Sequence, residues 1–216
     1  TGTSSMHIHT EVSFSDPREL RPVKSSSCLV IFVAVDEEGK PTPVPTFTPG
    51  PAKEIAMREN ALARIEIREQ IVASMNGQVY TDEGTAERVV LRFLAAPTDV
   101  NWGGKVHGGT VMRWIDEAAF VCASGWAQGP SAVVYVGGFR FYRPLLIGHL
   151  VEVEARLVYT GNKGMHIAVH VRSGDPKTTN MQLTTYCLTV MVTRDETGTA
   201  VPVKPWVPVS KEDRRL

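Results

Sequence analysis

One short segment carries most of the residue types that could do chemistry. It contains Asn101, then His107-Gly108-Gly109 six residues later, and then Asp116 seven residues after the second glycine. Because the two glycines stand where a helix is expected to begin, their backbone N–H groups and the positive end of the helix dipole can polarise a carbonyl oxygen. Asp116 falls inside that helix among apolar residues, where a carboxylate is unusual unless it is paired or takes part in a reaction.

Each of these residues also has an ordinary structural explanation. Asp116 could form a weak helix-surface pair with Arg113, three residues earlier, but Glu117 is the better placed partner for Arg113 and would leave Asp116 free. His107 could act as a base, although a loop histidine before two glycines is more often a structural hydrogen-bonding group. The histidines are scattered and the cysteines lie in strand segments, so no metal site is predicted, and no nucleophile elbow supports Ser-His-Asp catalysis.

The elements that would position these residues form one series. A helix is predicted from Thr110 to about Trp126, because Val111, Ile115, Ala118 and Cys122 recur at helical spacing on one face. A strand is expected before it and four strands after it, at residues 87–94, 131–141, 150–159, 165–172 and 182–193. One strand, one buried helix and four strands predict an α+β architecture, in which an antiparallel sheet wraps around a single helix.

The chain also repeats itself, which determines the predicted domain organisation. The opening TGTSSMHIHTEVSFSDP aligns without a gap on TGNKGMHIAVHVRSGDP, which begins at Thr160, and the similarity continues to about residue 49. Residues 1–49 therefore resemble only the last two strands of the series, at residues 6–14 and 23–35. We expect residues 50–80 to form an exposed, charged connector helix and linker, residues 81–209 a complete second unit, and residues 210–216 a polar tail that frays.

Half a unit cannot bury a core by itself, because strands need partners on their edges and a covering layer. Residues 1–49 are therefore expected to pack on another chain, or to belong to a longer natural polypeptide.

Composition excludes several classes of function. With 23 basic and 23 acidic residues the net charge is zero, so nothing indicates binding to nucleic acid or to an anionic membrane surface. No apolar run approaches the roughly 18 residues that a membrane span needs. Cys28 and Cys187 occupy the same repeat position inside apolar strands and are expected to be buried core thiols, which favours a reducing, cytoplasmic compartment.

The string N-x5-HGG-x6-D-E-A-A, followed by FRFYRPLLIGHLVEVEARLVYTGNKGMHI, resembles the hotdog-fold acyl-CoA thioesterases. The resemblance is closest to the brain-type cytosolic acyl-CoA hydrolases and their single-domain bacterial relatives. It covers nearly all of residues 87–209 and, more weakly, residues 1–49. It implies a hotdog fold and hydrolysis of acyl-CoA to a free acid and CoA, without a metal or a redox cofactor. Mammalian-type members carry two hotdogs in tandem, which would explain the repeat.

The resemblance also implies roles for individual residues. The acid at Asp116 would act as general base or nucleophile at the thioester, and the N–H groups of Gly108 and Gly109 would hold the thioester oxygen. Asn101 would orient water or substrate in the site of a partner hotdog, and His107 would line the substrate.

Further substrate contacts are expected outside this segment. The turn Asn162-Lys163-Gly164 could contact a CoA phosphate or be an ordinary solvated turn. Arg140 and Arg143, which alternate on one strand, could help to bind CoA or form a subunit interface.

The same resemblance implies composite sites between paired hotdogs. The second hotdog would come from the absent first half or from a second chain, and the assembly would be a homo-oligomer such as a trimer of hotdog pairs. Two alternatives remain open at this point. The domain could be a non-catalytic, regulatory hotdog that binds acyl-CoA, or a hydratase or dehydratase on the same fold.

Overall fold

The computed structural model describes residues 1–19, 21–178 and 180–216. The chain divides into two compact units, Thr1–Ile67 and Arg68–Leu216. Because their relative positions are not determined, each unit is described by itself.

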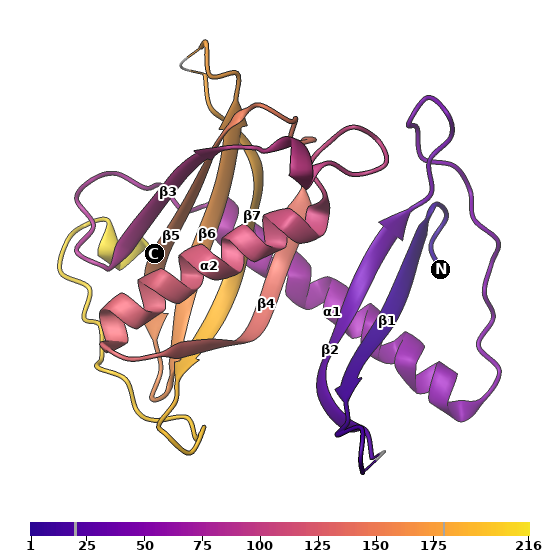
Figure 1. The fold of residues 1–216 in the computed structure, drawn as a ribbon, viewed down its shortest axis with the longest axis horizontal. Helices are drawn as coiled ribbons and strands as arrows, with labels where there is room; N and C mark the ends of the chain where they lie inside the picture. Colours follow the sequence, from indigo (N-terminus) through magenta and orange to yellow (C-terminus); the bar gives the residue numbers. More distant parts are fainter. Residues whose placement is uncertain (20, 179) are drawn as a thin grey trace. The chain divides into compact units, whose positions relative to one another are not determined.

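The second unit is a five-stranded antiparallel sheet with one helix, α2, against one of its faces (Figure 1). The strand order is β3-β5-β6-β7-β4, so that β3 and β4 form the two edges. This arrangement confirms the predicted α+β hotdog fold. The elements are β3 (Arg88–Leu94), α2 (Gly108–Ala127), β4 (Ser131–Phe141), β5 (Leu150–Thr160), β6 (Gly164–Gly174) and β7 (Gln182–Thr193), with a 3-10 turn, η1 (Pro97–Asp99), before the helix.

The core lies between α2 and the sheet. The helix face predicted from the sequence is fully covered, with Val111, Ala118 and Cys122 at 0% exposure. From the sheet, alternate residues of β5 such as Val151 and Val153 point toward this face and are equally buried. Burying each such side chain contributes roughly 1.5–3 kcal/mol, and the small residues of α2 let the helix approach the strands closely.

The opposite face of the sheet is also covered, which corrects one expectation. Helix α1 (Ala52–Asn76) begins directly after Pro51, but it is not exposed along its whole length. Met75 in its last turns is buried against Tyr186, and Ile71 and Val72 pack on the same cluster. The last turns of α1 therefore belong to the second unit, where they pack on the outer face of β6 and β7.

The C-terminal tail does not fray as expected. It ends in a 3-10 turn, η2 (Asp213–Arg215), whose Asp213 accepts hydrogen bonds from the backbone N–H and the hydroxyl of Thr85 at 2.9 and 2.6 Å. Glu212 is buried and pairs with Arg156 of β5 at 2.5 Å. Polarity suggested a solvated tail, but its two carboxylates accept from specific donors, in β5 and in the segment before β3.

The first unit holds a two-stranded hairpin, β1 (Ser5–Phe14) and β2 (Val23–Val33). Its pairing repeats that of β6 and β7 after 159 is added to each residue number: Met6 lies opposite Phe32, as Met165 lies opposite Met191. The turn after the hairpin also recurs, since Gly39 and Gly198 both have positive φ, at 80° and 83°. The repeat seen in the sequence is therefore a repeat of backbone structure.

The hairpin lacks the covering layer that its counterpart has. Cys28 is exposed, which corrects the expectation of a buried core thiol, whereas the equivalent Cys187 is fully buried. Ile8 and Phe32 are 44% and 52% exposed. The difference has a simple cause: β6 and β7 lie beneath α2, and the described residues of the first unit include no counterpart of α2.

Candidate active site

The loop before α2 is shaped by Asn101. Its Oδ1 accepts hydrogen bonds from the N–H groups of Gly103 and Lys105 at 2.8 and 3.0 Å, and its own N–H donates to the Lys105 carbonyl at 2.6 Å. Gly104 has a φ of +70°, a conformation that favours glycine in this tight turn. The loop carries Trp102, fully exposed, at its tip. Asn101 thus closes the loop with its side-chain carbonyl, and its amide nitrogen makes none of these bonds.

His107 is the N-cap of α2. Its Nδ1 accepts a hydrogen bond from the Gly109 N–H at 3.0 Å, and its carbonyl oxygen accepts from the Thr110 N–H at 3.0 Å. The side chain therefore satisfies one of the N–H groups that a helix start leaves unpaired. The two glycines consequently differ, because the Gly109 N–H that was expected to hold a substrate oxygen is used by His107 in this structure.

Gly108 keeps its N–H available. As the first helical residue it has no carbonyl within the helix to donate to, and no other partner for it occurs in the described part of the chain. A Cβ at Gly108 would lie 3.3 Å from the ring of Phe141, so glycine permits the close approach of β4 to the helix start. This N–H is the group that can receive a carbonyl oxygen at the dipole end.

Asp116 lies on the exposed side of α2 and borders a small hollow. The other residues around it are Met112, Ile115, Val136, Phe139 and Thr189. Partial burial, and secondarily the negative charge of Glu117, raise the pKa of Asp116 above its usual value. Glu117 instead pairs with Arg113 at 3.1 Å, as the sequence predicted, and none of the described basic residues forms an ion pair with Asp116.

Asp116 and the helix start are separated along α2. Eight residues at 1.5 Å per residue place Asp116 about 12 Å beyond Gly108 along the axis. A base and an oxyanion donor must both lie close to the same reacting carbonyl, at roughly 3 Å from it. The Asp116 and Gly108 of one hotdog are therefore too far apart to act on one thioester.

Two of the other predicted contacts lie elsewhere. The turn Asn162-Lys163-Gly164 joins β5 to β6 at the ends of these strands that are remote from His107, since α2 begins beside Phe141 and ends near the start of β3. Arg140 lies over the Tyr142 ring at 5.6 Å, and Tyr142 stacks on Tyr186 of the outer cluster. Arg140 thus faces away from α2, so the structure does not bring either group to the Asp116 hollow.

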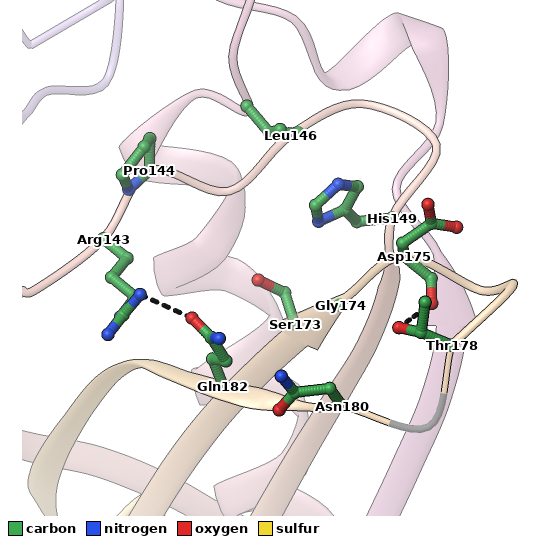
Figure 2. Close-up of a pocket in the computed structure, with 10 residues that line it drawn as sticks. All are labelled: Arg143, Pro144, Leu146, His149, Ser173, Gly174, Asp175, Thr178, Asn180 and Gln182. Atoms are coloured by element: carbon green, nitrogen blue, oxygen red, sulfur yellow. Dashed lines mark hydrogen bonds between the residues drawn. The ribbon is translucent and has the colours of Figure 1, made fainter.

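A second, polar pocket was not predicted from the sequence. Arg143, which was expected on the same strand as Arg140, lies beyond the end of β4 and lines this pocket. Figure 2 shows Arg143, Leu146 and His149 on one side of it, and Ser173, Asn180 and Gln182 on the other. Arg143, Leu146 and His149 lie between β4 and β5, whereas Ser173 lies at the end of β6 and Gln182 begins β7, so no local motif indicates the pocket. Among the described residues, no group of three or more His, Cys, Asp or Glu side chains could hold a metal ion.

Comparison with known proteins shows which family this chain belongs to. The family described as the thioesterase superfamily matches residues 103–180, which include the helix start and Asp116. A relative from Buchnera aphidicola, named an uncharacterized acyl-CoA thioester hydrolase, is 30% identical over 122 residues, or 55% of this chain and 90% of the relative. The chain belongs to the thioesterase superfamily.

Other members agree with this assignment. The rat cytosolic acyl coenzyme A thioester hydrolase is 27% identical over 128 residues. The aligned residues make up 58% of this chain but only 33% of the rat protein. Among solved structures, an apo-hexameric acyl-CoA thioesterase has a TM-score of 0.57 at 29% identity, covering 64% of this chain and 87% of that one. In the described part of the chain, no helix is both long and apolar enough to cross a membrane.

Proposed function

We propose that this chain hydrolyses acyl-CoA thioesters to a free acid and CoA, with Asp116 as general base or nucleophile. The observation that carries the proposal is the state of Asp116: a carboxyl with a raised pKa, beside an apolar hollow, whose neighbouring arginine is paired with Glu117. Perturbed carboxyls in such surroundings are characteristic of catalytic acids and bases. Relatives named acyl-CoA thioester hydrolases support the substrate class.

The chemistry needs only water and the two groups at the site. As general base, Asp116 accepts a proton from a water molecule while the water oxygen bonds to the thioester carbon. The carbonyl electron pair moves to oxygen, which the Gly108 N–H of a second hotdog stabilises. When the C–S bond breaks, the CoA sulfur leaves with the electron pair and takes up the proton from Asp116. As nucleophile, the carboxylate would instead attack the thioester carbon and expel CoA as a thiolate, which forms a mixed anhydride. Water then cleaves the anhydride, which releases the free acid, regenerates the Asp116 carboxylate and supplies the proton that the CoA thiolate takes up.

We further propose that the site is shared by two hotdogs. The separation of about 12 Å between Asp116 and Gly108 disappears if a second helix packs antiparallel to α2 with the axis of symmetry near Met112, which is 49% exposed. Asp116 would then lie beside the partner's helix start, and the amide of Asn101 would reach across to orient water or substrate.

The edge strand β4 supplies a surface for this pairing. Val133, Val134, Tyr135 and Val136 are all exposed in succession, at 39–54%. An open strand edge with apolar side chains pairs with another strand, which here would extend the sheet into a second hotdog. Hexameric thioesterases among the structural relatives support a homo-oligomer, proposed here as a trimer of hotdog pairs.

The decisive test is Asp116→Asn, which keeps the shape of the side chain but can neither accept a proton nor attack. Release of free thiol from acyl-CoA should fall by about 10²–10⁴, while acyl-CoA binding and circular dichroism stay unchanged. Glu196→Gln is the matched control, because it removes an exposed carboxylate in the turn after β7, outside α2, and should retain full turnover. Turnover by Asp116→Asn within about threefold of the parent, well below that range, would contradict the assignment, and tight binding without thiol release by the parent would favour a regulatory acyl-CoA-binding domain.

A further inference from the structure

Strand β4 contains one extra residue near its end, at Gly138. From Gly137 to Arg140 this strand advances three residues, while its partner β7 advances two, from Leu188 to Tyr186. Gly138 has a φ of +71°, a left-handed conformation that is common in β-bulges and that glycine adopts without strain. The bulge interrupts the regular alternation of side chains along β4.

The bulge decides which side chains of β4 face α2. Val136, two residues before Gly138, borders the Asp116 hollow. Strict alternation would therefore put Phe139 on the outer face of the sheet and Arg140 beside α2. With one residue added, Phe139 turns toward α2 and becomes a wall of the hollow, whereas Arg140 lies on the outer face. A shift of one residue in register reverses the side chains that follow it.

Helix α1 packs directly on this bulge from the outer face. A Cβ at Gly138 would lie 2.5 Å from Ile71 Cγ2, so the Ile71 side chain occupies the space that glycine leaves open. The same turns of α1 are anchored to the sheet, because the Tyr186 hydroxyl donates to Asn76 Oδ1 at 3.0 Å and Met75 is buried. Ile71 therefore contacts the bulge from an anchored part of the helix.

The residues beyond the bulge reach both parts of the proposed site. The rings of Phe139 and Phe141 meet edge to face, with their centroids 4.8 Å apart, and Phe141 lies against the helix start at Gly108. The hollow that Phe139 borders has a volume of about 30 Å³, far below the roughly 300–1,000 Å³ of most small-molecule sites. A space of this size suits a short acyl group, and the Phe139 ring is one of the walls that keep it small.

We infer that Ile71 of α1, through the Gly138 bulge, positions Phe139 as the residue that limits the length of the bound acyl group. The inference rests on the proposed function and adds a determinant of substrate length. Helix α1 precedes residues 103–180, which match the thioesterase superfamily, so its contribution does not follow from membership of the family. Ile71 is a positioning residue that acts from the outer face, whereas Phe139 contacts the acyl group.

The test compares dodecanoyl-CoA with butanoyl-CoA as substrates, through the ratio of kcat/KM for the long substrate to that for the short one. Phe139→Ala enlarges the hollow and should raise this ratio by about tenfold or more, the usual effect of pocket space for one or more methylenes. Ile71→Ala lets the bulge relax and should raise the ratio by a smaller factor, about threefold, as expected for a residue that does not contact the ligand. Ile67→Ala, at a position that is 50% exposed on the same helix, is the matched control and should leave the ratio unchanged.

The double variant Ile71→Ala/Phe139→Ala shows whether Ile71 acts through Phe139. Once the phenyl ring is absent, removal of the Ile71 side chain should not change the ratio further. If Ile71 had a purely structural role, Ile71→Ala would lower the rates on both substrates together and leave the ratio at its parental value, which would overturn the inference.

Binding of acyl-CoA thioether analogues, which cannot be hydrolysed, keeps this inference separate from the proposed function. In calorimetry, the affinity for the dodecanoyl analogue relative to the butanoyl analogue should rise by the same factors in Phe139→Ala and Ile71→Ala, whether or not the parent releases thiol. Absence of thiol release with these changes in binding would contradict the proposed function and support the inference. The inference is overturned if the parent binds neither analogue, if either single variant leaves the relative affinity unchanged, or if Ile71→Ala changes it equally with and without Phe139.

Discussion

At the scale of single residues, the chemistry depends on which polar groups are already satisfied. Arg113 is neutralised by Glu117, so Asp116 keeps its carboxyl free although a cation lies three residues away. Near the helix start, His107 accepts a hydrogen bond from the Gly109 N–H, so the Gly108 N–H remains available to a substrate. These two local pairings decide which groups face a substrate, and only the first follows from spacing along the helix.

The capping role of His107 can be separated from catalysis. His107→Ala removes the acceptor for the Gly109 N–H and should lower the free energy of unfolding by about 1 kcal/mol, the usual effect of losing an N-cap. His107→Asn, which can accept the same bond, should restore stability in thermal or urea unfolding. If His107 were the catalytic base, both variants would lose a factor of about 10²–10⁴ in kcat; we expect far smaller losses in the stable Asn variant.

At the scale of elements, β5 shows why both faces of one strand are buried. Its apolar residues face α2, and its charged residues form a network on the outer face. Arg156 donates to Glu154 at 2.9 Å and to Glu212 of the tail at 2.5 Å. The Tyr80 ring covers the guanidinium at 4.6 Å. Buried ions of this kind stabilise a fold only when each charge is compensated, and here the tail supplies one of the compensating charges.

This network predicts a pH dependence of stability. Burial alone would raise the pKa of Glu154, but hydrogen bonds from Arg156 and Arg172 outweigh it and lower that pKa to about 2. Since the folded pKa lies below the unfolded one, the carboxylate contributes stability that is present above about pH 4.5 and lost as the pH falls toward 2. Glu154→Gln should flatten the fall of unfolding free energy in this window, measured by urea unfolding. Glu196→Gln, in an exposed turn, is the control, and an unchanged slope in Glu154→Gln would refute the attribution.

Local patterns predicted the elements well, because helical and strand periodicities report directly which side of an element is covered. The predicted strand at residues 131–141 and the helix from Thr110 match β4 and α2 closely. The docked tail and the polar pocket could not be found in this way. Glu212 meets Arg156 across 56 positions, and Arg143 meets Gln182 across 39, so these contacts exist only once the sheet has formed.

At the scale of the whole molecule, the repeat and the divided site lead to the same conclusion. The β1–β2 hairpin reproduces the pairing of β6 and β7, yet its apolar residues are exposed. The exposed β4 edge similarly offers backbone and apolar side chains to a partner. Neither unit therefore satisfies all of its own surfaces, and on the proposed mechanism the catalytic groups are also divided between two hotdogs.

A subunit-mixing experiment tests this division. If Asp116 of one chain works with Asn101 of another, Asp116→Asn and Asn101→Ala should each be nearly inactive alone, because every site has one defect. In a two-fold symmetric pair that contains one Asp116→Asn chain and one Asn101→Ala chain, one site combines both substituted residues, and the other site combines the two unsubstituted ones. Random exchange makes half of the pairs mixed, so the mixture should recover roughly a quarter of the parental activity. Each variant taken separately through the same exchange is the control. Activity no higher than the mean of the two controls would show either that Asp116 and Asn101 act within one chain or that the paired hotdog is not a second copy of this one.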